Sequence, residues 1–359
     1  MYSKKSGEDL QTILGQIERL SPKNQQEMID QIEMALGDLI IDTNDSHNTK
    51  SVIFNISFRN KKYVMKVELN LGENAVKSEI NWYLKIGRSF PNCPKYVASF
   101  FGKRLSVIVL SYLENCQTID DLTLQSTITT NQTQKLIDKS LTKLNSLFEN
   151  NTKSQVSLDH ADSLYIRKFE SRYKEALNYK SLGQLFSYEN FYINGEKLSN
   201  FSAYISKIDR DEKLKRLLTP NIFGLIHGDL HCGNILAKKN KIYFVDPNGN
   251  LSMPIEYDYG KIFHSIHGGY GAIMAKKYKL KKITQNKFEF SVQKPQAYQH
   301  VFNKLTKMPS ELFVRSLYSE AMHFATMLPH HASNENETTA LFLSGILTFK
   351  NLFDILKLY

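Results

Sequence analysis

The residues best suited to chemistry lie in one short stretch of the chain. It reads His-Gly-Asp, four further residues and Asn over 227–234, and Asp246 follows Asn234 by twelve residues. In phosphoryl transfer one carboxylate accepts the proton of the attacking hydroxyl, while an amide and a second carboxylate hold Mg²⁺ on the ATP phosphates. The spacing of Asp229, Asn234 and Asp246 therefore predicts a site for phosphoryl transfer.

The segments around these residues predict how they are presented. Residues 223–226 are apolar and predict a strand that leads into the loop, and residues 234–237 predict a strand that leaves it. Residues 238–241 predict a polar turn, after which residues 242–245 return toward Asp246. We therefore expect a loop followed by a hairpin. The alternative is an ordinary strand-turn-strand unit with acids on its surface.

This stretch resembles the catalytic loop of the kinase-like small-molecule phosphotransferases, a group that includes the aminoglycoside phosphotransferases and the choline, fructosamine and methylthioribose kinases. The sequence matches the His-Gly-Asp, four residues, Asn pattern at every fixed position. The resemblance implies that Asp229 is the catalytic base, that Asn234 is a magnesium ligand and that Asp246 is the principal magnesium ligand. It also implies ATP and Mg²⁺ as cofactors.

A further acid matches the same group. Asp258 stands twelve residues beyond Asp246, within Glu-Tyr-Asp-Tyr-Gly at 256–260. The resemblance implies that Asp258 braces the catalytic loop, and we expect His227 to brace it by hydrogen bonding. Such a motif carries weight only in its predicted structural context.

The resemblance implies an α+β fold that is bilobal and protein-kinase-like. A β-rich N-lobe would cover residues 1–113, with a helical extension over 1–37 and a nucleotide-binding sheet over 38–113. A mainly helical C-lobe with the catalytic loop and the acceptor site would cover residues 114–359. Periodicity predicts strands over 39–41, 52–58, 63–67 and 105–112, and helices over 74–86, 136–148, 165–177, 297–307, 310–328 and 336–358.

Within the sheet, Lys66 lies late on a predicted strand, and Glu79 follows it by thirteen residues in a predicted helix. A Lys that contacts the α- and β-phosphates must be held by a carboxylate, or it would swing into solvent. Lys66 and Glu79 are therefore predicted to form this pair, with a surface Lys and an exposed acid as the alternative. Glu73 competes for the acidic role, although it lies too near the start of the helix.

Two further segments are expected to contact the nucleotide. Residues 42–51, where the phosphate loop falls, contain no glycine, although Asn, Asp and Ser there tolerate turns whose N–H groups can cap phosphates. Ser111, Tyr112 and Leu113 follow the last predicted strand of the sheet. We expect them to be the hinge between the lobes, with backbone groups that pair with adenine.

Two helical segments have less specific patterns. Residues 8–37 predict two short helices, and Pro22 stands at the first position of the second helix. Their apolar stripes favour packing on the N-lobe over binding of a partner. The helix predicted over 165–177 carries basic and aromatic residues, and we expect it near the acceptor side of the cleft.

Composition narrows the class of protein. The chain has 359 residues, 42% hydrophobic and 23% charged, which is ordinary for a soluble globular protein. We find no signal peptide, and the apolar runs noted are too short to span a bilayer. The three widely spaced cysteines favour a reducing cytoplasm over a disulfide scaffold or a zinc site.

The net charge of +10 has two interpretations, attraction of a polyanion or a solvated basic surface. The Lys residues are dispersed, and only 276–282 forms a cluster, so we expect neither a nucleic-acid nor a membrane partner. His323, His330 and His331 lack the matched ligands of a metal site. Cys232 stands at a variable position of the motif, so a nucleophilic role is disfavoured.

These observations predict an ATP- and Mg²⁺-dependent O-phosphotransferase that acts on a hydroxyl of a small metabolite. The segment 246–258 is too short for a protein-kinase activation segment, which argues against a protein acceptor. Asp246-Pro247 and the tract 257–270 resemble sugar-directed kinases, including kinases of bacterial surface-polysaccharide pathways, so a sugar or sugar derivative is favoured.

Other substrates and another class of protein remain as alternatives. Choline or ethanolamine is the runner-up, because the aromatic residues could form a cage for an ammonium group. An aminoglycoside would call for a strongly acidic pocket, whereas the chain is basic. The hypothesis of a different class is a non-catalytic, nucleotide-binding regulator whose N-terminal helices bind a partner.

Overall fold

The chain divides into two compact units. Unit 1 comprises Met1–Cys116 and Tyr243–Leu251, and unit 2 comprises Gln117–Ile242 and Ser252–Tyr359. The computed structural model describes residues 15, 17, 20, 22–23, 25–35, 40–45, 51–58, 60–69, 75–86, 90–102 and 104–357. The helix predicted over 8–20 and the competing acid Glu73 lie largely or wholly outside these residues.

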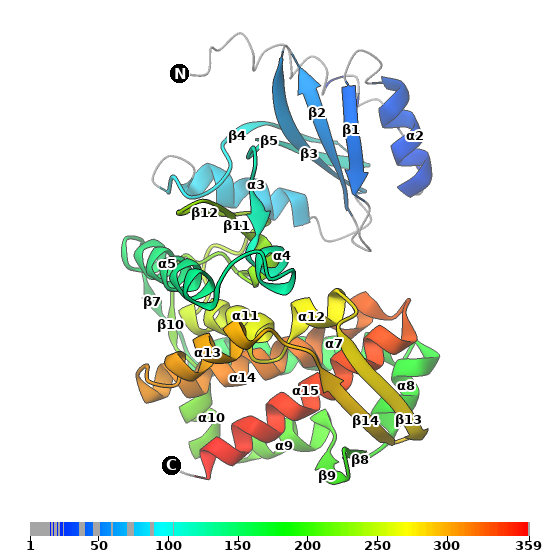
Figure 1. Ribbon diagram of the computed structural model, residues 1–359, viewed down its shortest axis with the longest axis vertical. Coiled ribbons are helices and arrows are strands. Elements are labelled where there is room, and N and C mark those ends of the chain that lie inside the picture. The colour runs from blue at the N-terminus through cyan, green and yellow to red at the C-terminus, as the bar shows by residue number, and fades with distance from the viewer. Residues whose placement is uncertain are drawn as a thin grey trace. The chain divides into compact units, whose positions relative to one another are not determined.

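Unit 1 is built on a five-stranded antiparallel sheet (Figure 1). Its order is β1 (Ile40–Asp45), β2 (Ser51–Phe58), β3 (Lys61–Leu69), β5 (Leu105–Ser111) and β4 (Tyr96–Phe101). Alternate side chains of β2, including Val52, Phe54 and Ile56, are buried, as expected for a strand with one face on a core. A left-handed Asn60, with φ +60°, closes the turn between β2 and β3.

Two helices pack on this sheet. In α2 (Gln25–Ala35), Met28 and Ile32 are buried in the same core as Val52 and Phe54, so this helix packs on the sheet as predicted. The second helix, α3 (Ala75–Ile86), buries Glu79 together with apolar side chains such as Trp82.

Two expectations for unit 1 need correction. The strand β4 was not predicted, because its residues follow a proline-containing segment and lack a clean apolar alternation. The phosphate loop expected over 42–51 is shorter than predicted, since residues up to Asp45 belong to β1 and Ser51 begins β2. Residues 46–50 lie outside the described part of the chain.

Unit 2 is mainly helical, as predicted. Its first half contains β6 (Gln117–Thr118), α4 (Ile119–Leu124), α5 (Thr130–Glu149), β7 (Ser154–Gln155), α6 (Leu158–Asp162), η1 (Ser163–Arg167), α7 (Lys168–Ala176), α8 (Lys180–Ser187), β8 (Asn190–Ile193), β9 (Glu196–Ser199), α9 (Phe201–Arg210), α10 (Glu212–Leu218) and β10 (Ile222–Phe223). The loop at 227–234 ends in η2 (Cys232–Asn234). After it come β11 (Ile235–Lys238), β12 (Lys241–Phe244, whose last two residues belong to unit 1), α11 (Ile255–Ile266), α12 (Tyr270–Met274), β13 (Tyr278–Thr284), β14 (Lys287–Val292), α13 (Gln296–Leu305), α14 (Ser310–Met327), η3 (Leu328–His331) and α15 (Glu335–Leu356).

The hairpin predicted after the catalytic loop is present as β11 and β12, and the three C-terminal helices fall close to their predicted ranges. The helix predicted over 165–177 differs, because a π-helical segment, η1, precedes α7. Between the hairpin and the C-terminal helices, Gly269, with φ +80°, separates α11 from α12. The strand predicted over 223–226 is reduced to β10, which pairs with β7.

Three helices, α11, α14 and α15, form the centre of unit 2 (Figure 1). Within the described part of the chain, α15 is the one helix long and apolar enough to cross a membrane, with a mean hydropathy of 1.4 over its most apolar window. Since 61% of that window is buried inside the protein, α15 serves here as a core helix. Helices α11 and α14 approach closely at Gly260, where an added Cβ would lie 2.5 Å from Ser319 Oγ and 2.9 Å from Glu320 N.

We predict that Gly260→Ala lowers the free energy of unfolding by about 1–3 kcal/mol, because overpacking forces α11 and α14 apart. Gly183→Ala is the matched control: Gly183 is also helical, and its added Cβ would meet no atom closer than 3.6 Å. It should be neutral or stabilising by up to about 1 kcal/mol. Urea denaturation measures both changes, and equal stability of the two variants would contradict the close packing.

Candidate active site

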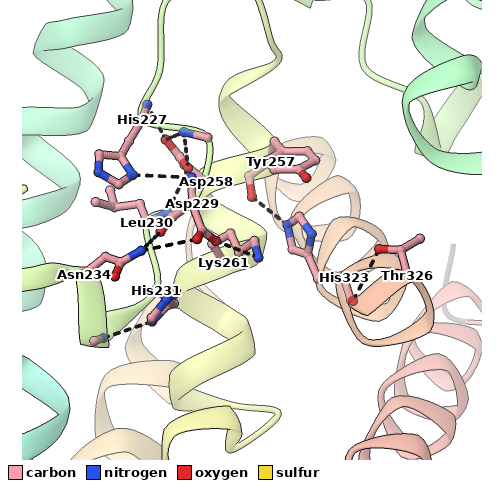
Figure 2. Close-up of polar contacts among 12 residues, drawn as sticks. His227, Asp229, Leu230, His231, Asn234, Tyr257, Asp258, Lys261, His323 and Thr326 are labelled. Atoms are coloured by element: carbon pink, nitrogen blue, oxygen red, sulfur yellow. Dashed lines mark hydrogen bonds and ion pairs between the residues drawn. The ribbon is translucent and has the colours of Figure 1, made fainter. Parts of the chain in front are cut away.

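The catalytic loop is held by one buried carboxylate. Asp258 lies in the first turn of α11 and is fully buried. It accepts hydrogen bonds from the backbone N–H groups of His227 (2.8 Å), Gly228 (2.9 Å) and Leu230 (3.2 Å), as Figure 2 shows. Burial raises the pKa of Asp258 to about 7, and the three N–H groups act in the opposite direction by favouring the carboxylate.

Side chains of the loop itself complete this arrangement. His227 is buried, and its Nδ1 accepts a hydrogen bond of 3.3 Å from the N–H of Asp229. Gly228 has φ +82°, a conformation that a residue with a Cβ rarely adopts. The N–H of Cys232 donates to Ser265 Oγ at 2.9 Å, so α11 holds the loop at a second point.

Asp229 is held between a cation and an amide. Lys261, three residues after Asp258 on α11, places its Nζ 2.7 Å from Asp229 Oδ1 (Figure 2). Burial alone would raise the pKa of Asp229, but Lys261 and then His231 lower it more, so the pKa lies well below its usual range. Asp229 is therefore ionised at neutral pH, as a group that accepts a proton must be.

The amide of Asn234 is oriented by the same carboxylate. Its Nδ2 donates to Asp229 O at 2.9 Å and to Asp229 Oδ2 at 3.3 Å. Because Nδ2 is directed at Asp229, and no hydrogen bond to Oδ1 occurs among the described residues, Oδ1 is left for another ligand. Amide oxygens are ligands that Mg²⁺ accepts in proteins.

Unit 1 carries the second group of predicted site residues. Lys66 lies on β3, and its Nζ is 2.9 Å from Glu79 Oε2 on α3 and also forms an ion pair with Asp246. Burial alone would lower the pKa of Lys66, but the carboxylates of Asp246 and Glu79 raise it more, so it is raised overall. Burial raises the pKa of Glu79 to about 7, which Lys66 opposes.

Asp246 is presented by a tight turn. It is half exposed and has φ +58°, a left-handed conformation that is uncommon for a residue with a side chain. Gly249 has φ +82° and lies so close to α3 that an added Cβ would be 2.2 Å from the carbonyl carbon of Ser78. The Asp-Pro-Asn-Gly turn therefore packs directly beside Glu79.

The hinge residues are only partly available to a ligand. The N–H of Ser111 donates to Lys95 O at 2.9 Å, and the N–H of Tyr112 donates to Lys62 O at 3.3 Å. These two N–H groups are therefore engaged within the protein, whereas over the residues that the structure describes the N–H of Leu113 makes no hydrogen bond. Pairing of the backbone of Ser111, Tyr112 and Leu113 with adenine stays a prediction.

Asn234 in unit 2 and Asp246 in unit 1 are each considered by themselves as predicted ligands of Mg²⁺. No group of three or more His, Cys, Asp or Glu side chains that could hold a metal occurs among the described residues. Mg²⁺ commonly uses one or two carboxylates together with substrate phosphates and water. The half-exposed carboxylate of Asp246 and the oriented Oδ1 of Asn234 suit that chemistry, and their roles as ligands stay predictions.

Lys261 is the site residue that the sequence analysis missed. Its charge is directed at Asp229 because Asp258, three residues earlier on the same helix face, faces the loop. A helix predicted from residue 255, with Asp258 turned toward the loop, would have identified Lys261.

No protein-family model and no curated protein matches the chain. Among solved structures, an apo thermostable mutant of the aminoglycoside phosphotransferase APH(4)-Ia is similar, with a TM-score of 0.52 and 10% identity over 89% of this chain and 97% of that one. A Plasmodium vivax ethanolamine kinase has a TM-score of 0.52 and 12% identity over 98% of this chain and 95% of that one. The fold is that of the kinase-like small-molecule phosphotransferases.

A further structure of the same phosphotransferase, in a ternary complex with ADP and hygromycin B, has a TM-score of 0.50 and 9% identity over 88% of this chain and 97% of that one. The predicted α+β, kinase-like fold is thereby confirmed. At these low sequence identities the similarity shows the kinase-like fold alone. The substrate and the roles of individual residues have to be argued from the site itself.

We predict that Asp258→Ala lowers the free energy of unfolding by about 3 kcal/mol or more, since each buried N–H left unpaired costs about 1–3 kcal/mol. Amide hydrogen exchange should also become faster at His227, Gly228 and Leu230. Asp354→Ala is the control: Asp354 forms half-exposed ion pairs with lysines on α15 and just after it, and should change stability by less than about 1 kcal/mol. Unchanged exchange in the loop of Asp258→Ala would contradict the bracing role.

The Lys66–Glu79 pair is predicted to act as a unit in nucleotide use. Lys66→Ala and Glu79→Ala should each raise the KM for ATP or lower kcat, and the double variant should be no worse than the worse single one. Lys61→Ala, an exposed Lys on the same strand, is the control. Fully additive losses in the double variant would show that the two residues act independently.

Proposed function

We propose that this protein is an ATP- and Mg²⁺-dependent O-phosphotransferase that transfers the γ-phosphate to a hydroxyl of a small metabolite, in the cytoplasm. The observation that carries the proposal is the catalytic loop. There an ionised Asp229 and an Asn234 with its oxygen free are fixed together by Asp258. A carboxylate and an amide at this spacing on one braced loop suit a base and a metal ligand for the same phosphate.

Each residue then has a defined task. The acceptor hydroxyl gives its proton to Asp229, its oxygen forms the new P–O bond to the γ-phosphorus, and ADP leaves with the electron pair of the bond that breaks. Lys66, held by Glu79, contacts the α- and β-phosphates. Asn234 and Asp246 would hold Mg²⁺, which when bound neutralises charge on the phosphates.

The acceptor is proposed to be small and sugar-like. Helix α11 begins at Ile255, nine residues after Asp246, which leaves little chain for a peptide platform. The similar solved structures are named for a phosphotransferase of aminoglycosides and a kinase of ethanolamine, both small acceptors. Asp246-Pro247 favours the sugar-directed members. A non-catalytic regulator is disfavoured because it has no chemical need for Lys66, Asp229, Asn234 and Asp246 together.

Substitution of the two acids separates their tasks. Asp229→Asn should lower kcat by about 10²–10⁴-fold, the usual contribution of a general base, and leave ATP affinity nearly intact. Asp246→Asn should instead weaken Mg²⁺-dependent ATP binding, measured by calorimetry. Asp354→Asn, far along the chain in α15, should change neither quantity. Loss of ATP binding in Asp229→Asn with surviving turnover would reverse the two assignments.

A further inference from the structure

Lys168 has a half-buried ammonium group that contacts α11, the helix that holds the catalytic loop. It lies at the start of α7, directly after the π-helical segment η1, and π-helical turns occur frequently at functional sites. Its Nζ is 2.8 Å from the hydroxyl of Tyr257 and 5.4 Å from the centre of the Tyr257 ring. Within the described chain Lys168 forms no ion pair, so its charge is met by a neutral phenol alone.

The same Tyr257 connects Lys168 to the helix that carries Lys261. Tyr257 and Lys261 are four residues apart on α11 and therefore lie on one face of the helix. Lys261 is 18% exposed and contacts Asp229, which is 31% exposed, so both side chains reach solvent at the catalytic loop. Two ammonium groups thus contact neighbouring positions, one at Asp229 and one at the Tyr257 hydroxyl.

Three carboxylates of neighbouring elements have partners other than Lys168. Glu175 on α7 binds Arg172 at 2.6 Å, and Glu337 on α15 binds His331 at 3.0 Å. Asp120 at α4 accepts a hydrogen bond of 2.6 Å from the Tyr298 hydroxyl. None of these three acids forms an ion pair with Lys168 among the described residues.

The histidine that contacts Tyr257 carries no charge of its own. His323 lies on α14, and its Nε2 is 3.0 Å from the backbone oxygen of Tyr257 (Figure 2). Burial lowers the pKa of His323 well below its usual value, and Lys261 and Lys168 lower it further. The imidazole therefore stays neutral and adds no charge beside either Lys.

We propose that the acceptor of this enzyme carries an anionic group, a phosphate or a carboxylate, and that Lys168 and Lys261 bind it beside the hydroxyl that is phosphorylated. This inference rests on the proposed function and specifies its substrate class. An anion supplies Lys168 with the partner that the protein does not provide. It also lets Lys261 bridge the acceptor and Asp229, so that charge positions the hydroxyl at the base.

Two lysines at the acceptor site would distinguish between substrates of different charge, which the fold alone does not. A cationic acceptor such as an amino alcohol or an aminoglycoside would be brought next to two ammonium groups and repelled. A neutral sugar would leave Lys168 without a counter-charge. Sugar phosphates and sugar acids would supply both lysines with a negatively charged partner. Their sugar ring could still contact the aromatic ring of Tyr257.

The test is an ADP-release assay with acceptors matched in carbon skeleton: neutral sugars, their phosphates and uronic acids, and their amino derivatives. The best anionic acceptor should exceed its neutral counterpart in kcat/KM by about 10–100-fold, the effect of a charge-assisted hydrogen bond. Lys168→Gln should raise the KM for that acceptor by a similar factor without changing the KM for ATP, and Lys168→Arg should restore most of the loss.

The control variant is Lys304→Gln, an exposed Lys of α13 that pairs with Asp138 and should change neither KM. Circular dichroism of Lys168→Gln checks that the variant is folded. If the best acceptor is neutral or cationic, or if Lys168→Gln behaves like Lys304→Gln toward an anionic acceptor, the inference is wrong while the phosphotransferase function stands. If no acceptor of any charge gives ADP release above that of Asp229→Asn, the proposed function fails and the inference fails with it.

Discussion

Three backbone N–H groups of the catalytic loop converge on the carboxylate of Asp258, and the arrangement of the reactive side chains depends on this contact. The N–H groups are buried away from water, so without Asp258 they would have no hydrogen-bond partner in the folded protein. Asp258 lies in the first turn of α11, where the helix dipole also favours a negative charge. Since Lys261 follows one turn later, the same helix fixes the loop and places the cation that keeps Asp229 ionised.

Unit 1 holds its predicted site residues in position by other contacts. Lys66 is held by Glu79 on a packed helix, and Asp246 is held by a turn with φ +58° at the aspartate itself. Such strain persists only where the surroundings determine the conformation, and it occurs often at functional sites. Gly249, which packs on the backbone of Ser78, supplies that constraint. The strained residue is also the one predicted to bind the metal.

Local chemistry explains what could be predicted from the sequence. The loop at 227–234 and the following hairpin have short-range patterns, and the thirteen-residue spacing of Lys66 and Glu79 matched a strand followed by a helix. Lys261 and Lys168 could not be assigned in the same way, because their roles arise from contacts with Asp229 and Tyr257 on other elements. The π-helical turn before Lys168 and the strand β4 depend on tertiary packing that no local pattern records.

The central claim, a phosphotransferase of small molecules, is tested most directly by following the γ-phosphate of ATP itself. The protein is incubated with γ-³²P-labelled ATP and a protein-free extract of small metabolites, and the label is traced by chromatography. The account predicts label in a new small-molecule phosphate ester, formed by the natural sequence and strongly reduced in Asp229→Asn. Label on protein side chains, or release of the label only as inorganic phosphate at the same rate in both proteins, would contradict it.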